Sequence, residues 1–207
     1  MAVLISMQKV FLNGDFIDKD SAKISIFDRG FIFGDGIYEV VPVINGVMVE
    51  KQGFWDRFKR SLNEIDLSLP YSKDEFENIL NELIKINSLN EGGIYIQITR
   101  GIAQRDFSFV SGITPTVMAF AFSDSVLEHP GAKSGITIIS TPDIRWKRRD
   151  IKSISLLGQC YAKNQATIAG ADECFMIEDG YVTEAGSSSA FIIKDGTLIT
   201  KPLSNEI

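Results

Sequence analysis

The stretch that decides the fold is DIKSISLLG, residues 150–158. Its lysine, Lys152, has apolar residues on both sides, and an ammonium group is costly to bury among such neighbours. Burial favours the neutral amine, which is the form that can attack an aldehyde carbon. Later in the chain, Glu184 ends the sequence Val-Thr-Glu, and its carboxylate could hydrogen-bond a protonated pyridine nitrogen. Together the two residues indicate a site for an aldehyde cofactor that accepts electrons.

Each of these residues also has an ordinary structural explanation. Most lysines are solvated, and a lysine between apolar residues usually extends its ammonium to water. A glutamate before small residues is equally typical of the end of a hairpin strand. The surrounding motifs must therefore decide between the two interpretations.

Several separated motifs, in a fixed order, carry a resemblance to a known family. They are Asp28–Gly30, Phe33–Gly36, Tyr38–Val41, Thr99–Gly101, the lysine segment 143–158 and Val182–Glu184. In this order they resemble the class IV (fold-type IV) aminotransferases that use pyridoxal phosphate, and most of all the D-amino-acid (D-alanine) transaminase branch. The resemblance runs from about Val10 to the last residue.

The resemblance implies how the cofactor, pyridoxal 5′-phosphate, is held. Lys152 would carry it as a Schiff base and then move the proton between the substrate Cα and the cofactor C4′. Glu184 would hydrogen-bond the pyridinium nitrogen. Arg57 would grip the phosphate, for which a planar and permanently charged fork is well suited, and Ser187 and Ser188 would lie near it.

The substrate residues implied by the resemblance are Tyr38 and Arg105. Both would receive the substrate carboxylate, and Arg105 would reach in from the second subunit of a homodimer. One position departs from the family, because Phe107 stands where the D-alanine enzymes carry a histidine. The sole histidine of the chain, His129, lies in a Pro/Gly segment. We therefore expect a carboxylate site that is weaker or differently built.

The sequence ends at Ile207. In the family this point lies just before a Gly-Ile-Thr loop that binds the phosphate at a helix N-terminus. We therefore expect a chain that is shortened at its C-terminal end relative to the family. An inactive fragment or binding module is the alternative to an enzyme.

The pattern of turns and periodic segments predicts an α+β fold with two α/β subdomains, the second incomplete. Asn-Gly and Asp-Gly pairs at 13–14, 45–46, 179–180 and 195–196 predict four hairpins. Helical spacing predicts helices over residues 54–65, 72–86 and 157–169, and further strands are expected at 93–100, 116–122 and 136–140. We expect a small domain at 1–122, a connection at 123–135, and at 136–207 the start of a larger cofactor domain that carries the lysine.

Two short motifs have simpler interpretations than catalysis. Gly34-Asp35-Gly36 lacks the ending of a P-loop, and we interpret it as a turn before the Tyr38 strand. Ser187–Ser189 lacks the elbow of a serine hydrolase. The basic run 147–149 is interpreted as a solvated turn.

Composition excludes several classes of binding partner for this protein. The net charge of −6 argues against nucleic acid as the main partner. No apolar run is long enough to span a bilayer, and two cysteines, expected to be packed and unbridged, fit a reducing cytoplasm. One histidine and two cysteines leave too few ligands for a zinc site.

The function expected from the sequence is transamination of an amino acid, D-alanine in the first instance, with a 2-oxo acid. Two alternatives on the same fold are a 4-amino-4-deoxychorismate lyase and a branched-chain amino-acid transaminase.

Overall fold

A computed structural model describes residues 9–204, and these divide into two compact units. Unit 1 is Met1–His129 with Lys152–Ile154, and unit 2 is Pro130–Ile151 with Ser155–Ile207. The boundary falls within the expected connection at 123–135. Lys152, which we expected in the second domain, groups instead with the first unit. Each unit is described by itself.

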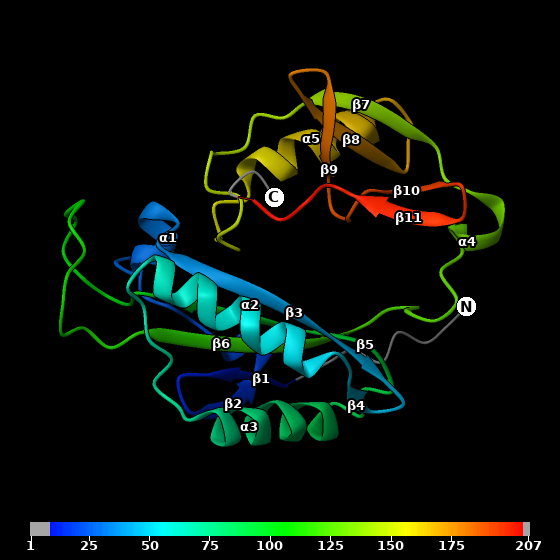
Figure 1. Cartoon of the computed structure of the whole chain (residues 1–207). Coiled ribbons are helices and arrows are strands. Elements are labelled where there is room, and N and C mark those ends of the chain that lie inside the picture. The colour runs from blue at the N-terminus through cyan, green and yellow to red at the C-terminus, as the bar shows by residue number, and fades with distance from the viewer. Residues whose placement is uncertain (1–8, 205–207) are drawn as a thin grey trace. The chain divides into compact units, whose positions relative to one another are not determined.

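Unit 1 is built on a six-stranded sheet in the order β2-β1-β6-β5-β3-β4, with antiparallel pairing throughout (Figure 1). The strands are β1 Lys9–Leu12, β2 Asp15–Asp18, β3 Gly36–Ile44, β4 Val47–Met48, β5 Glu91–Thr99 and β6 Thr116–Ser123. The hairpin turns Asn13-Gly14 and Asn45-Gly46 have positive φ at both residues, as type I′ turns require. The two hairpins predicted for this region are confirmed.

Two helices, α2 (Lys51–Glu64) and α3 (Lys73–Ile86), cover one face of this sheet (Figure 1). The rings of Phe58 in α2 and Phe76 in α3 stack with centroids 6.2 Å apart, and both side chains are fully buried. A capping box starts α3, where Ser72 accepts a hydrogen bond from the Glu75 N–H and Glu75 accepts one from the Ser72 N–H. Along β3 alternate side chains are buried, so this strand has one face toward the helices.

Three short elements were not predicted. They are the 3-10 turn η1 (Lys19–Ser21), helix α1 (Arg29–Phe33) and helix α4 (Gly131–Ser134), which lies within the expected connection. Such elements are too short to show a helical period in the sequence. Helix α1 begins where Asp28 accepts a hydrogen bond from the Gly30 N–H and ends at Gly34, whose φ is 67°. Gly34 and Asp35 therefore connect α1 to β3, which begins at Gly36 and contains Tyr38, so the turn predicted here is present just before the strand.

Unit 2 holds a three-stranded sheet in the order β7-β8-β9 and a separate hairpin, β10-β11. The strands are β7 Ile138–Pro142, β8 Glu173–Glu178, β9 Tyr181–Ala185, β10 Phe191–Lys194 and β11 Thr197–Thr200. Strands β7 and β8 are parallel, and helix α5 (Leu157–Ile168) lies between them in the chain. Helix and sheet share a small core of Ala162, Ala166, Cys174 and Met176. Both late hairpins and the helix ending before Gly170 are confirmed.

Candidate active site

The lysine segment runs along the first part of β3, on the side that β4 leaves unpaired. The Tyr38 N–H donates to the Lys152 carbonyl at 2.9 Å, the Ile154 N–H donates to the Gly36 carbonyl at 3.1 Å, and Ser153 forms an antiparallel bridge with Ile37. Residues that lie opposite each other in an antiparallel pair project from the same face of the sheet. The backbone register therefore places the side chains of Lys152 and Tyr38 on one face.

The amine of Lys152 contacts Tyr38 directly. Its Nζ lies 3.2 Å from the Tyr38 hydroxyl oxygen and 4.3 Å from the centre of the Tyr38 ring. Lys152 is half-buried, whereas Leu157, an apolar residue of the same segment, is 83% exposed. The immediate environment of the amine is thus an aromatic hydroxyl and ring, which sequence spacing did not indicate.

Tyr38 is fixed by a row of stacked rings across the sheet. Its ring stacks on Tyr95 of β5 at 5.6 Å, and Tyr95 stacks on Phe120 of β6 at 4.9 Å. Burial raises the pKa of Tyr95 to about 12, with a smaller contribution from Tyr38. Tyr95 therefore remains protonated at neutral pH and acts as a rigid support for Tyr38.

Ser61 is a residue of this site that the sequence did not reveal. It is a fully buried side chain on α2, and its Oγ accepts the Lys152 backbone N–H at 3.2 Å. A buried serine among the apolar residues of a helix carries no signal of its own, because its partner is 91 positions away. Ser61 connects the lysine segment to the helical layer.

Arg57 forms a two-pronged ion pair with Glu39. Its Nε and Nη2 lie 2.6 and 2.7 Å from the two Glu39 carboxylate oxygens. This hydrogen bonding raises the pKa of Arg57 above its ordinary value, while burial acts in the opposite direction. The Glu39 side chain is completely buried, whereas that of Arg57 is 49% exposed. Because only one edge of the guanidinium faces Glu39, its Nη1 edge is available to an oxyanion.

Arg105 lies in an exposed loop, residues 102–114, that leaves β5 and returns to β6. Its guanidinium carbon lies 5.7 Å from the centre of the Phe33 ring and 5.0 Å from that of Phe107. The two rings themselves are 5.4 Å apart. Phe107, which stands in place of the family histidine, thus lines Arg105 with an aromatic face instead of a hydrogen-bonding group.

Glu184 lies on β9 in unit 2, half-buried, and accepts a hydrogen bond from the Ala190 N–H at 3.3 Å. Its neighbour Thr183 is held firmly, since the Thr183 hydroxyl lies 2.6 Å from Asp143 Oδ2. Burial opposes ionisation of Asp143, but hydrogen bonds from Arg145 and Thr183 hold its pKa well below the ordinary value. The strand that carries Glu184 is therefore anchored by a buried carboxylate.

Ser187 and Ser188 both donate their hydroxyls to Glu173, at 2.7 and 3.2 Å. Burial opposes ionisation of Glu173, yet hydrogen bonds from Ser187 and the Cys174 N–H, together with Lys163, keep its pKa below the ordinary value. Both hydroxyls would have to turn from Glu173 to donate to a phosphate. Their geometry alone does not place them in a phosphate site.

The basic run at 147–149 was predicted to be a solvated turn, and this is wrong for Arg149. The Arg149 side chain is 1% exposed and lies 3.4 Å from Asp143 Oδ2 and 2.7 Å from Glu178 Oε2. Two carboxylates from distant positions compensate its charge, and such partners cannot be read from a local run of basic residues. Lys147, paired with Glu178, and Arg148, paired with Asp150, are both exposed to solvent.

The cysteines differ from each other. Both are free, with Cys174 buried in the unit 2 core and Cys160 exposed. The prediction of unbridged thiols is confirmed, but that of two packed thiols is wrong for Cys160, which lies on the outer side of α5.

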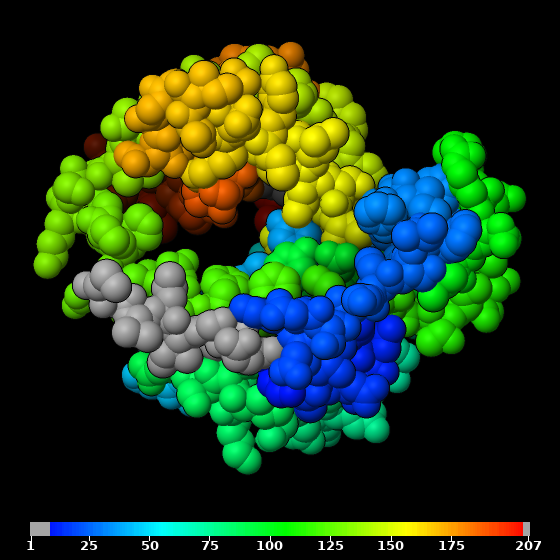
Figure 2. Space-filling model, turned by 180° about the vertical axis from the view of Figure 1, so that it is seen from behind, coloured from blue at the N-terminus to red at the C-terminus, as the bar shows by residue number. Residues whose placement is uncertain are grey.

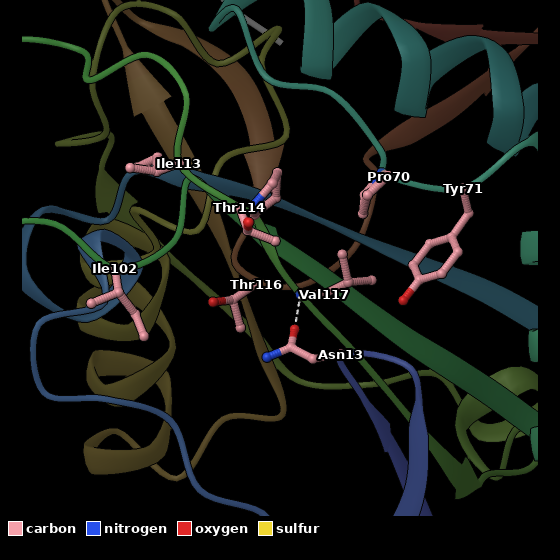
Figure 3. A pocket seen from close by; sticks show the side chains of 9 residues that line it. Asn13, Pro70, Tyr71, Ile102, Ile113, Thr114, Thr116 and Val117 are labelled. Carbon is pink, nitrogen blue, oxygen red and sulfur yellow. Dashed lines mark hydrogen bonds between the residues drawn. The ribbon is translucent and has the colours of Figure 1, made fainter.

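A pocket of about 460 Å³ lies elsewhere in unit 1 (Figure 3). Asn13, Tyr71, Ile102 and Val117 are among its lining residues, and the Val117 N–H donates to Asn13 Oδ1 at 2.8 Å. None of the predicted site residues lines this pocket. Within residues 9–204, no group of three or more metal-ligating side chains is gathered, and no helix is long and apolar enough to cross a bilayer.

Comparison with known proteins agrees with this architecture. A family model described as amino-transferase class IV matches residues 36–207. The D-alanine aminotransferase of Staphylococcus haemolyticus is 44% identical over 202 residues, which cover 97% of this chain and 71% of that protein. The branched-chain amino acid aminotransferase of Escherichia coli matches with a TM-score of 0.84 at 19% identity, covering 96% of this chain and 69% of that one. The branched-chain aminotransferase of Thermoproteus uzoniensis with norvaline matches with a TM-score of 0.78 at 25% identity, covering 97% and 70%. The predicted fold class, α+β of fold type IV, is confirmed.

Proposed function

Because the chain belongs to the class IV aminotransferase family, we propose that it moves the amino group of D-alanine, or of a closely similar D-amino acid, to a 2-oxo acid. The observation that carries the proposal is the pairing of Lys152 with Tyr38 at the edge of β3. The identity of 44% to a D-alanine aminotransferase supports the choice of amino donor.

The cofactor of this family is pyridoxal 5′-phosphate, and the residues present fit it. Lys152 offers an amine beside a hydroxyl, and the outer edge of Arg57 is open to a phosphate. Glu184 offers a carboxylate for the ring nitrogen, and Ser187 and Ser188 would supply hydroxyls near the phosphate. When bound, the cofactor provides an electron sink for the substrate Cα.

Lys152 is the residue that moves the proton. Its neutral amine would take the proton from the substrate Cα and then deliver it to the cofactor carbon C4′. The Tyr38 hydroxyl, 3.2 Å away, accepts one amine N–H and so orients the lone pair of the amine. The stacked rings of Tyr95 and Phe120 hold the Tyr38 ring, and therefore its hydroxyl, in this position.

Tyr38 and Arg105 would bind the substrate carboxylate. A hydroxyl and a guanidinium both donate to carboxylate oxygens, and only the arginine carries the opposite charge. The Phe33 and Phe107 rings, which lie beside each other and contact the Arg105 guanidinium, leave its donors free for that role. Placement of the carboxylate decides which Cα bond points at Lys152, and therefore which enantiomer reacts.

A homodimer is supported by exposed apolar side chains on unit 1. Ile26, Phe31, Ile102, Phe107 and Phe109 are all more than half exposed, and they lie on α1, its approach and the Arg105 loop. Such a gathering is typical of a protein–protein contact. Phe31→Glu should shift the protein toward a monomer in size-exclusion chromatography with light scattering. Val47→Glu, at another exposed apolar residue, is the matched control.

We place the activity in the cytoplasm. The support is the pair of unbridged cysteines, Cys160 and Cys174, which a reducing compartment preserves.

The decisive experiment follows the absorbance of the protein with pyridoxal phosphate. A yellow band that D-alanine bleaches and pyruvate restores, with no response to L-alanine, is the expected result. Lys152→Ala should abolish the band, while Lys59→Ala, at an exposed lysine on α2, should leave it intact. Borohydride reduction followed by mass spectrometry should find the cofactor mass on the peptide that contains Lys152.

The same experiment separates the alternatives. A 4-amino-4-deoxychorismate lyase would release pyruvate from its substrate without consuming a 2-oxo acid. A branched-chain transaminase would respond to L-leucine instead of D-alanine. If no band forms, the chain does not hold the cofactor and the proposed function is wrong.

A further inference from the structure

A cluster of three charged side chains is buried beneath the Arg105 loop. Asp35 Oδ2 accepts hydrogen bonds from Arg29 Nε at 2.6 Å and from Arg100 Nε at 2.8 Å. The Arg29 side chain is 2% exposed, that of Arg100 is 5% exposed and that of Asp35 is 6% exposed. Two cations thus share one carboxylate oxygen away from water.

Because one carboxylate cannot satisfy two guanidinium groups, their other N–H donors must find carbonyl oxygens. Arg100 donates from Nη1 and Nη2 to the carbonyls of Asp66 and Ile65, at 3.1 and 2.6 Å. Arg29 donates from Nη1 to the carbonyl of Asp106 at 2.6 Å. Arg100 is therefore bound to the end of α2, and Arg29 is bound to the loop that carries Arg105.

The Asp106 carbonyl belongs to the residue directly after Arg105. The base of the loop is tied separately, since the Arg29 N–H donates to the Gly101 carbonyl and the Ala103 N–H donates to the Phe27 carbonyl. On the far side of Arg105, the Phe109 ring lies 3.8 Å from the Arg100 guanidinium carbon. In Figure 2 this loop, in green, lies against the light-blue segment that contains α1.

The hydrogen bond from the buried Arg29 therefore reaches the loop one residue after the exposed Arg105. This bond holds the peptide unit that joins Asp106 to Phe107, and so it constrains the direction in which the neighbouring Arg105 side chain leaves the loop. The Phe33 ring, four positions after Arg29 on α1, lies under the guanidinium carbons of both arginines, at 4.8 Å from Arg29 and 5.7 Å from Arg105.

We propose that Arg29, oriented by Asp35, is a positioning residue that holds Arg105 in place for the substrate carboxylate. The inference rests on the proposed function for the role of Arg105. Arg29 and Asp35 would then act without touching substrate or cofactor. Loss of the hydrogen bond from Arg29 to the Asp106 carbonyl should weaken recognition of the carboxylate and leave the amine chemistry at Lys152 intact.

The test uses Arg29→Lys in the holoenzyme with two amines that differ only by the carboxylate, D-alanine and ethylamine. Lysine keeps the charge beside Asp35 but lacks the fork that reaches the Asp106 carbonyl. We expect the single-turnover rate constant for D-alanine at low concentration to fall about tenfold, and that for ethylamine to stay within about twofold. An equal loss for both amines would mean a purely structural role and would overturn the proposal, as would no loss for either.

A second readout needs no cofactor. Hydrogen–deuterium exchange should become faster at residues 103–109 in Arg29→Lys and remain unchanged in β5 and β6. Uniformly faster exchange across the sheet would contradict a local tether. Asp35→Asn should produce the same local pattern, and it replaces Arg29→Lys if that variant does not fold. If the unsubstituted protein fails to transaminate D-alanine, the proposed function is wrong, and the exchange data alone decide whether Arg29 tethers the loop.

Discussion

The Lys152 amine lies 3.2 Å from the Tyr38 hydroxyl, and the same two residues are joined by a 2.9 Å backbone hydrogen bond. A reactive amine is thus attached twice to one strand, once through its side chain and once through its backbone. This double attachment limits the positions that the amine can reach and pre-orients it for a single geometry.

Removal of the Tyr38 hydroxyl should slow the reaction without releasing the cofactor. Tyr38→Phe keeps the stacked ring but cannot accept the amine N–H, so we expect kcat for D-alanine to fall about tenfold. Steady-state kinetics and the absorbance band report the two effects separately. Tyr95→Phe, which loses only a hydroxyl bonded to Gln97, should change kcat little. Loss of the band in Tyr38→Phe would contradict this interpretation.

Ser61 should matter more for the lysine segment than for the stability of its own helix. Ser61→Ala leaves the partly buried Lys152 N–H without its acceptor, at a cost of about 1 kcal/mol. We expect lower kcat together with a reduced midpoint in urea denaturation. Ser68→Ala, at an exposed serine after α2, is the control and should change neither. A variant with full activity would show that the hydrogen bond is not needed.

The Arg57–Glu39 pair should respond unequally to loss of each partner. Arg57→Ala leaves a fully buried carboxylate without its cation, and we expect a loss of about 3 kcal/mol in the free energy of unfolding. Glu39→Gln should cost less, since half of the Arg57 side chain already reaches water. Urea titrations of the two variants measure the difference, and the reverse order would refute the argument. Arg57→Ala should also weaken cofactor binding, which fluorescence titration can measure.

Protonation of Asp143 should lower the stability of the protein at acidic pH. Its pKa is lowered in the folded state, so its contribution is fully present above the unfolded value of about 3.9 and is lost as pH falls below it. The urea midpoint should therefore fall between pH 5 and pH 3. Asp143→Asn should show a smaller fall over the same window. Equal slopes for the two proteins would assign the acid sensitivity to other carboxylates, such as Glu173 or Glu178.

Local sequence was sufficient for most of the secondary structure. Asn13-Gly14 and Asp179-Gly180 adopt positive φ in the hairpins that they predict, because few residue pairs tolerate that conformation. The periodic stripe of Phe76, Leu80 and Leu83 predicts α3 for a similarly local reason. Helix α1 was missed since its five residues cover little more than one turn.

The sequence by itself determined the hairpins, the long helices, the fold class and, through ordered motifs, the family and the choice of Lys152 as the reactive residue. The tertiary structure alone decided that Ser61 and Tyr38 hold that lysine, that Glu39 occupies one edge of Arg57, and that Asp35 joins two buried arginines beneath the Arg105 loop. The physical reason is separation along the chain. Turn and helix preferences act over a few residues, whereas each of these contacts joins side chains or backbone groups that only the completed sheet and its helices bring together.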